Sequence, residues 1–353
     1  MRTILFALLA VALTIQHSAR ADEGGPTNDE LRAAVAKALP LLAKGAAGHR
    51  TERTCFACHN QGIPILAMTT ARTRAITIDE EELGKQLQFI ADFLGRNRES
   101  YLQGKGQGGQ VDTAGYALLS LELGGWKPDA TTAAVSEYLL LYRKDEDHWR
   151  ANSQRPPTEA SPFTTTYVGL RGLQTFGTPE QKDRIAARTE QVRTWLLKTP
   201  AKDNEDRVFR LFALRAATAP EDDLKAAQQD LLKSQRADGG WSQLDFQPSA
   251  ESDSDEPSDD NKPDFTLSDA YATGTALVAL HQAGGLSTSD PAYQRGLRYL
   301  LQTQLPDGSW LVPSRSKPFQ KYFETGFPHG KNQFISSAAS GWATTAIALA
   351  CEK

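Results

Sequence analysis

Hydrophobic residues recur along the chain at the three- and four-residue spacing of amphipathic helices, and hardly any stretch alternates as a β-strand would. The predicted helices are of two kinds. Charged, amphipathic helices are expected at residues 29–45, 80–95, 131–145, 182–198, 221–235 and 291–304. Small, apolar and nearly uncharged helices are expected at residues 111–125, 161–177, 206–219, 267–285 and 336–350, and residues 59–74 fit this second kind less well.

The two kinds alternate along the chain, which gives six helical hairpins. A helix that is apolar all round is buried, whereas an amphipathic helix covers a core. The alternation therefore predicts two concentric layers, with the apolar helices inside and the charged helices outside. We expect an all-α fold, an (α/α)6 toroid formed by a single domain over residues 22–353. The alternative is an open α-solenoid built from the same hairpins.

Two hairpins share the pattern Q-x-x-x-G-x-W, at residues 235–241 and 304–310, and in both the pattern ends a charged helix. Glycine suits the left-handed turn that often ends a helix. The Gln amide can bond free backbone groups near that end, and the Trp can lie over the turn. We interpret the pattern as a structural staple and not as a binding site.

These turns resemble the QW motifs of the squalene–hopene cyclase and prenyltransferase superfamily of α/α toroids. The segments SDAYATGTALVAL (268–280) and FETGFPHG (323–330) add to the resemblance, which covers about residues 222–350. It implies a toroid whose cavity opens at the N-terminal ends of the inner helices. The partner that it implies is a hydrophobic or isoprenoid small molecule.

In the cyclases the catalytic acid lies in a D-x-D-D motif at the start of an inner helix, and the nearest counterpart here is GQVDTAGYAL at residues 109–118. Asp112 is then the candidate catalytic acid, because Gly109 and Val111 occupy the other two acidic positions. Protonating an alkene needs a carboxylic acid strengthened by its neighbours, so a single Asp at this place is interpreted as an N-cap. Protein prenyltransferases require a Cys-containing zinc site. Cys351 lacks that context and is expected to be a buried, inert thiol.

The net charge and the N-terminal segment indicate where the protein is located and which partners are excluded. The 353 residues carry a net charge of −4, which gives no basic footprint for nucleic acid. Residues 1–21 contain Arg2, an apolar run and the small-residue site ending at Ala21, which together predict a secretory signal peptide. No later apolar run approaches the length of a membrane span. We expect an exported protein, periplasmic in a Gram-negative bacterium, with no transmembrane anchor after cleavage.

Residues 55–59 read C-x-x-C-H, the pattern through which c-type haem is covalently attached. It predicts thioether bonds from Cys55 and Cys58 to a haem and places the imidazole of His59 on the iron. The alternatives are a Cys55–Cys58 disulfide, a redox dithiol and a partial zinc site.

The sixth iron ligand is less defined. Met68 follows His59 by nine residues, about 13 Å on a helix, so we expect it in the core. His329 precedes the last inner helix, which should lie beside the first in a closed ring, and it is the candidate distal ligand. His49 and an open position are the alternatives.

Aromatic residues of the inner helices and the final loop are expected to line the cavity: Tyr116, Phe163, Tyr167, Tyr271, Phe327 and Trp342. Apolar, aromatic cavities suit hydrophobic ligands. Residues 245–265 hold eight acidic residues and one lysine, among prolines and serines, and predict a solvated, flexible loop.

The sequence therefore predicts an exported toroid that carries haem c. Its expected function is electron transfer to a redox partner protein, or haem-dependent redox chemistry on a hydrophobic small molecule. A non-catalytic ligand-binding or scaffold toroid without haem, and a squalene or terpenoid cyclase-like isomerase, are the two alternatives.

Overall fold

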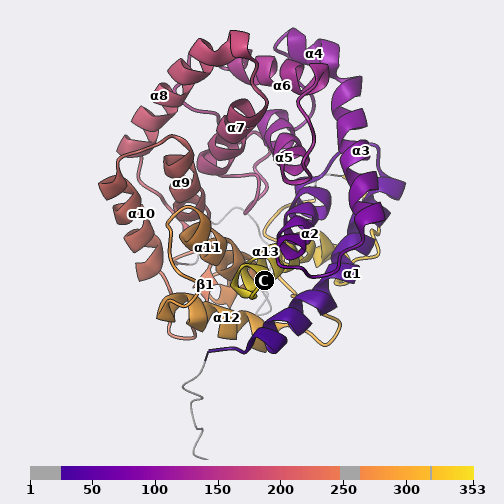
Figure 1. The fold of residues 1–353 in the computed structure, drawn as a ribbon, viewed down its shortest axis with the longest axis vertical. Coiled ribbons are helices and arrows are strands. Elements are labelled where there is room, and N and C mark those ends of the chain that lie inside the picture. The colour runs from indigo at the N-terminus through magenta and orange to yellow at the C-terminus, as the bar shows by residue number, and fades with distance from the viewer. Residues whose placement is uncertain (1–24, 247–262, 319) are drawn as a thin grey trace, which may run out of the picture.

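The computed structural model describes residues 25–246, 263–318 and 320–353 (Figure 1). The predicted signal peptide and most of the predicted acidic loop lie outside the described residues. Within the described part, none of the helices combines the length and the apolar character that crossing a membrane requires.

The described residues form twelve main helices in two layers. The inner helices are α2 (Ile63–Thr73), α5 (Gln110–Leu123), α7 (Pro162–Phe176), α9 (Asn204–Ala216), α11 (Ala270–Gln282) and α13 (Gln333–Ala350). The outer helices are α1 (Asn28–Glu52), α3 (Glu80–Arg96), α6 (Ala130–Leu141), α8 (Lys182–Lys198), α10 (Glu221–Lys233) and α12 (Pro291–Thr303). The short elements are the π-helix η1 (Cys58–Gly62), α4 (Arg98–Leu102), the 3₁₀ turns η2 (Pro179–Gln181) and η3 (Gly330–Asn332), and the paired strands β1 (Trp241–Ser242) and β2 (Ser268–Asp269).

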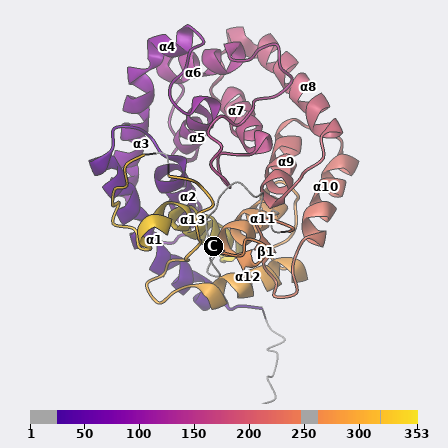
Figure 2. The ribbon, with the colours of Figure 1, turned by 180° about the vertical axis from the view of Figure 1, so that it is seen from behind.

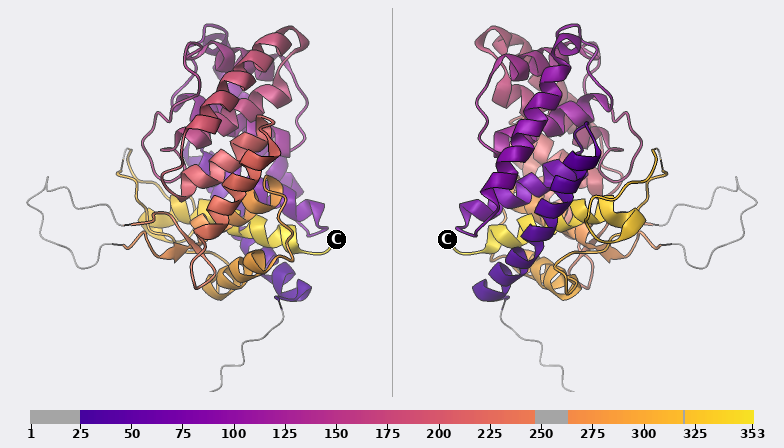
Figure 3. Two further views of the ribbon diagram at one scale, coloured as in Figure 1. Left: turned by 90° about the vertical axis from the view of Figure 1, so that its left-hand side faces the viewer. Right: turned by 90° about the vertical axis from the view of Figure 1, so that its right-hand side faces the viewer.

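The inner helices form a closed ring. Each one contacts the next in chain order, and α13 contacts both α11 and α2. Figures 1 and 2 show this ring from its two ends, with the outer helices around it, and the side views in Figure 3 show the outer helices lying across its wall. The predicted (α/α)6 toroid is thus confirmed. The open solenoid is wrong, because the last hairpin packs against the first.

Small residues let the inner helices approach one another closely. A Cβ atom added at Gly274 of α11 would lie 2.7 Å from the backbone nitrogen of Ala343 in α13. One added at Gly115 of α5 would lie 2.5 Å from the side chain of Val168 in α7. The apolar, small-residue pattern of these segments therefore reflects close helix packing around the ring.

The Q-x-x-x-G-x-W turns act as staples, as predicted. The indole nitrogens of Trp241 and Trp310 each donate to a carbonyl ten residues earlier in the preceding outer helix, at 2.9 Å. The Gln304 amide donates to its own turn and to the Ala34 carbonyl of α1, both at 3.0 Å. Because α1 belongs to the first hairpin, this second bond ties the two ends of the toroid together. Trp149 repeats the ten-residue spacing by donating to the Leu139 carbonyl at 3.3 Å.

Candidate functional site

An acidic segment opens the inner helix α9. The residues are Asp203, Asn204, Glu205 and Asp206. The Asp203 carboxylate caps the helix by accepting from the backbone nitrogen of Asp206 at 3.0 Å. The Asp206 carboxylate accepts from the Ser161 hydroxyl at 2.7 Å, which ties α9 to the start of α7. These two side chains hold the first turn of α9 and leave Glu205 to point into the toroid.

Glu205 is a buried carboxyl with two hydroxyl donors. Its exposed fraction is 5%. Its Oε1 accepts from the Thr164 hydroxyl at 2.8 Å and its Oε2 from the Tyr271 hydroxyl at 3.0 Å. Burial raises the pKa of Glu205 well above the usual range of a carboxyl, and the nearby charge of Asp203 adds to this rise, while the bond from Thr164 opposes it. Burial therefore favours the protonated form of the Glu205 carboxyl.

An apolar cavity of about 260 Å³ lies in the centre of the ring, towards the C-terminal ends of the inner helices. Its lining includes five aromatic side chains, Tyr116, Tyr167, Phe209, Phe212 and Trp342. Phe209 follows Glu205 by one helical turn and so lies on the same face of α9. Burial raises the pKa of Tyr116 well above its usual range, and the charge of Glu205 adds to the rise. Glu205 itself does not line the cavity, but it precedes the lining residue Phe209 by one helical turn.

Two polar atoms of the lining have no hydrogen-bond partner among the described residues. They are the hydroxyl oxygen of Tyr116 and the indole nitrogen of Trp342, both buried. Arg171 lies at the cavity too, where it donates to the Tyr167 hydroxyl at 2.8 Å and pairs with Glu122. The cavity is thus mostly apolar, with a few polar groups that could orient a ligand.

The cavity prediction holds for three of its six residues. Tyr116, Tyr167 and Trp342 line the central cavity, whereas Tyr271 does not line it and donates to Glu205. Two assignments need correction, because those rings pack between the layers. The Phe163 ring packs at a tilt against Trp195 of α8, with ring centroids 4.6 Å apart. A Cβ atom at Gly45 of α1 would touch the ring of Phe327.

Asp112 is not the N-cap that the sequence analysis expected. Gly109 precedes the first residue of α5, and Asp112 lies inside the first turn with 2% of its surface exposed. Its carboxylate accepts from the Thr165 hydroxyl of α7 and from the backbone nitrogen of Asn152 at 3.4 Å. Burial raises its pKa to about 7. The side chain therefore joins two inner helices and does not cap one.

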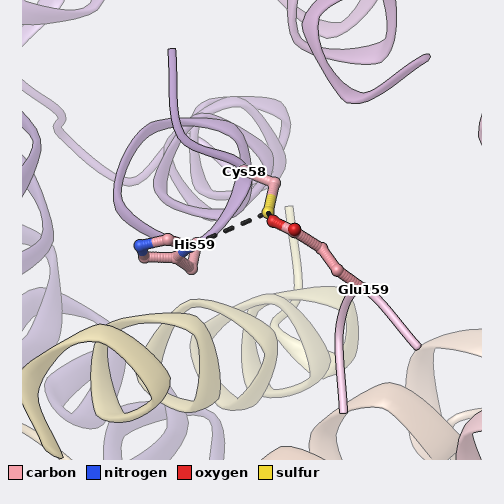
Figure 4. A group of neighbouring side chains, drawn as sticks. All are labelled: Cys58, His59 and Glu159. Atoms are coloured by element: carbon pink, nitrogen blue, oxygen red, sulfur yellow. Dashed lines mark hydrogen bonds between the residues drawn. The ribbon is translucent and has the colours of Figure 1, made fainter. Parts of the chain in front are cut away.

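The C-x-x-C-H segment leads from α1 into the first inner helix, as expected. Its two cysteines are free thiols, Cys55 exposed and Cys58 buried. The Cys58 thiol donates to Glu159 Oε1 at 3.1 Å and lies 3.8 Å from His59 Nδ1 (Figure 4). Burial lowers the pKa of His59 to about 3, helped by the positive charge nearby, so its imidazole is neutral.

A second cavity, of about 510 Å³, lies beside His59. Its lining includes Lys317, Lys321 and Lys331, together with apolar side chains such as Phe334 and Ile335. A haem bound through C-x-x-C-H needs the imidazole over the iron and both sulfur atoms at the edge of the ring. His59 lines the cavity, but neither Cys55 nor Cys58 does. The arrangement fits an iron-binding imidazole and does not fit the two thioether bonds.

The candidate distal ligand lies elsewhere. His329 Nε2 shares a hydrogen bond of 2.7 Å with the Ser309 hydroxyl in the last staple turn, and His329 does not line the cavity beside His59. Instead, the ring of Phe334 in α13 packs against the His59 ring, with their centroids 5.5 Å apart, so the last inner helix does approach the motif. His49 is buried and its Nε2 bonds the Cys55 carbonyl. Met68 and Cys351 are buried, as expected.

Comparisons with known proteins agree with this architecture. The profile of the squalene-hopene cyclase C-terminal domain matches residues 206–342. The type II terpene cyclase MstE from Scytonema is similar over 92% of this chain and 99% of its own, at 13% identity and a TM-score of 0.55. The fold is a terpene cyclase-like α/α toroid. One variant of that cyclase is in complex with its substrate geranylgeranyl dihydroxybenzoate, at 14% identity and a TM-score of 0.54.

The same toroid also occurs in other enzymes. A glycosidase variant in complex with glucose is similar over 92% of this chain and 98% of its own, at 12% identity and a TM-score of 0.59. No curated protein matches the chain. At these identities the likeness of the structures concerns the fold, and the chemistry of this terpene cyclase-like toroid has to be argued from its own residues.

Sequence reasoning missed Glu205 although a signal was present. Residues 203–206 read D-N-E-D at the start of an inner helix, which differs from D-x-D-D by one carboxyl for another. The helix predicted from the apolar pattern starts at Asp206, whereas α9 starts at Asn204 and its N-cap is Asp203. Phe209 and Phe212 were missed with it.

Proposed function

We propose that this protein protonates a carbon–carbon double bond of a hydrophobic, isoprenoid-type molecule held in the central cavity, and so acts as a terpenoid cyclase-like isomerase. The observation that carries the proposal is Glu205, a buried carboxyl whose pKa is raised by burial and which lies one helical turn before Phe209 of the aromatic cavity. A proton donor has to be protonated at rest and within reach of its substrate. Burial favours the first condition for Glu205, and its position one helical turn before the lining residue Phe209 supports the second.

The same residues also stabilise the products of proton transfer. When the Glu205 proton moves to an alkene carbon, the electron pair of the double bond forms the new C–H bond and leaves a carbocation. The faces of Tyr167, Phe209 and Trp342 attract such a cation. The hydroxyls of Thr164 and Tyr271 stabilise the Glu205 carboxylate that remains. Loss of a proton from a neighbouring carbon completes an isomerisation, with no atom gained or lost.

The cavity constrains the substrate. A volume of about 260 Å³ lies just below the roughly 300–1,000 Å³ of most ligand pockets, which favours an isoprenoid shorter than squalene. The predominantly apolar lining favours such a ligand over a sugar, although glycosidases share the fold. A non-catalytic, ligand-binding toroid would use the same cavity and leave Glu205 without a role.

Deuterium incorporation tests the proposal. The purified protein is incubated in D2O with squalene, farnesol, geranylgeraniol and geranylgeranyl dihydroxybenzoate, and the products are analysed by mass spectrometry. We expect one carbon-bound deuterium per product, and a rate at least about 100-fold lower for Glu205→Gln. Asp112→Asn is the matched control, because it removes a second buried carboxyl of raised pKa and should leave the rate within a few-fold.

A Glu205→Gln variant that folds, by circular dichroism, and keeps the parent rate would exclude Glu205 as the donor. Absence of labelled product from every substrate would favour the ligand-binding alternative. The predicted export is tested separately, by the N-terminus of the protein recovered from a host with a secretory pathway.

Covalent haem remains a prediction from the sequence, and with it electron transfer to a redox partner or haem-dependent redox chemistry. The imidazole of His59 and the cationic side chains beside the second cavity support it, since lysines suit haem propionates. Its test is a Soret band that survives denaturation after expression in a host with cytochrome c maturation.

A further inference from the structure

We propose that Cys58, His59 and Glu159 bind a single transition-metal ion, with zinc as the ion that this donor set fits best. The three side chains come together from two segments that lie 101 residues apart (Figure 4). Their ligand atoms, a sulfur, a nitrogen and an oxygen, all lie within 4.8 Å of one another. The proposed proton donor and the aromatic cavity use none of the three, and all of them lie outside residues 206–342, which match the cyclase profile.

The distances are close to those of a tetrahedral zinc site. With Zn–S near 2.3 Å and Zn–N or Zn–O near 2.0–2.1 Å, tetrahedral ligand atoms are separated by about 3.3–3.6 Å. Here Cys58 Sγ lies 3.1 Å from Glu159 Oε1 and 3.8 Å from His59 Nδ1. These two distances differ from the tetrahedral values by only a few tenths of an ångström, and the His59 and Glu159 ligand atoms lie within 4.8 Å of each other, so side-chain movements would place an ion between the three atoms.

The loop before α7 holds Glu159 in position for this role. Arg155 and Glu159 form an isolated β-bridge, with two backbone hydrogen bonds of 3.0 Å. The Arg155 guanidinium also pairs with Glu159 Oε2, which leaves Oε1 directed at the Cys58 thiol. A carboxylate oriented through its second oxygen is typical of metal sites, where such contacts fix the ligand geometry.

The site has room for a fourth ligand. His59 and Glu159 both line the second cavity, whereas Cys58 is buried behind them. Three protein ligands and one open position are the arrangement of catalytic zinc sites, in contrast to the closed four-ligand sites that only stabilise a fold. Because Lys317, Lys321 and Lys331 line the same cavity, we expect the fourth ligand to be water or an anion.

The metal site and covalent haem exclude each other, because thioether formation consumes the Cys58 sulfur. The position of that sulfur favours the metal, since the Cys58 thiol donates to Glu159 and Cys58 itself does not line the cavity. The two also differ in what they require of Cys55. Haem attachment and a disulfide need both cysteines, whereas the metal site needs Cys58 alone.

Metal binding is tested with the full-length chain, purified in the presence of a reductant. The metal-free protein is loaded with Zn²⁺ or, as a spectroscopic probe, Co²⁺, and the bound metal is counted after gel filtration by elemental analysis. We expect one ion per chain and a thiolate-to-cobalt charge-transfer band in the near ultraviolet. Cys58→Ser should abolish that band, and Glu159→Gln should weaken binding at least about 10-fold.

Cys55→Ser is the matched control and should bind metal like the parent. Less than half an ion per chain, or a cobalt spectrum without the thiolate band, would overturn the proposal. It would also be overturned by equal losses in Cys55→Ser and Cys58→Ser, or by a covalent Soret band that needs both cysteines. Circular dichroism of each variant separates lost binding from lost folding. These measurements involve no isoprenoid, so their outcome is independent of the proposed proton transfer.

Discussion

The buried carboxyl of Asp112 makes the stability of the protein depend on pH in a direction opposite to that of most carboxylates. Burial is the main cause of its raised pKa, and the nearby charge of Glu159 adds to the rise, while the bond from Thr165 opposes it. In the unfolded chain the group titrates near its ordinary value. Between the two pKa values the folded protein therefore binds one proton more than the unfolded chain, and its free energy of unfolding falls as the pH rises.

The size of the effect follows from the two pKa values. A rise from 3.8 to about 7 corresponds to about 4 kcal/mol, because each unit is worth about 1.4 kcal/mol. This contribution is fully present below about pH 4 and is lost by about pH 7. Asp112→Asn cannot ionise, so its stability curve should lack this part of the slope. Asp269, whose pKa is raised to about 6, and Glu205, whose pKa is raised well above its usual range, add a slope of the same sign in both proteins, so only the difference between the two curves reports on Asp112.

Urea unfolding of the metal-free protein, followed by circular dichroism at half-unit steps from pH 4.5 to pH 8, measures this difference. As the pH rises over this range, the free energy of unfolding of Asp112→Asn should increase relative to that of the parent, by up to about 3 kcal/mol. Asp222→Asn, in a fully exposed side chain at the start of α10, is the control and should follow the parent. Parallel curves for Asp112→Asn and the parent would refute the reasoning, since the carboxyl would then be as ionised in the folded protein as in the unfolded chain.

Two further predictions concern the toroid itself. Gly274→Ala should destabilise the protein by about 1–3 kcal/mol, because its Cβ would collide with the backbone of α13. Gly84→Ala, on the open face of α3, should stabilise it by about 0.5–1 kcal/mol. Equal changes in the free energy of urea unfolding would contradict the packing argument. Gln304→Ala should lower the free energy of unfolding by about 1–2 kcal/mol through its two lost backbone bonds. Hydrogen exchange should also show that the amides of α1 exchange faster in Gln304→Ala than in the parent. If they exchange at the same rate, the bond to α1 does not help to close the ring.

The two-layer architecture was predictable because helix amphipathicity and helix burial have the same cause. The boundaries of α8 coincide with the predicted segment, since its charged face and its ending are both visible in the sequence. The first inner helix fitted less well for a physical reason. Its first turn is a π-helix whose buried Asn60 and Gln61 give it a polar composition. Gln61 offsets its burial by bonding the Ala57 nitrogen and Gln86 of α3.

The sites were only partly predictable, because each depends on contacts between distant segments. C-x-x-C-H is visible as a local pattern in the sequence. Glu159, which completes the proposed metal site, lies 101 residues further along the chain and approaches Cys58 only in the folded protein, through the loop before α7. The position of the His329 side chain was equally unpredictable from the sequence. Ring closure does bring the last inner helix to the motif, yet the left-handed backbone of His329 turns its imidazole to Ser309.

The contrast between the two buried acids explains why the proton donor belongs to α9. Burial raises the pKa of both Asp112 and Glu205, so the direction of the pKa shift alone does not separate them. The Asp112 oxygens accept from one hydroxyl, that of Thr165, and from the backbone nitrogen of Asn152. Glu205 instead precedes Phe209 of the aromatic cavity by one helical turn, and two hydroxyls, those of Thr164 and Tyr271, donate to its oxygens and would stabilise its negative charge. An acid that must give up its proton to carbon needs both of these arrangements at once, and among the described carboxyls of the inner ring Glu205 combines them.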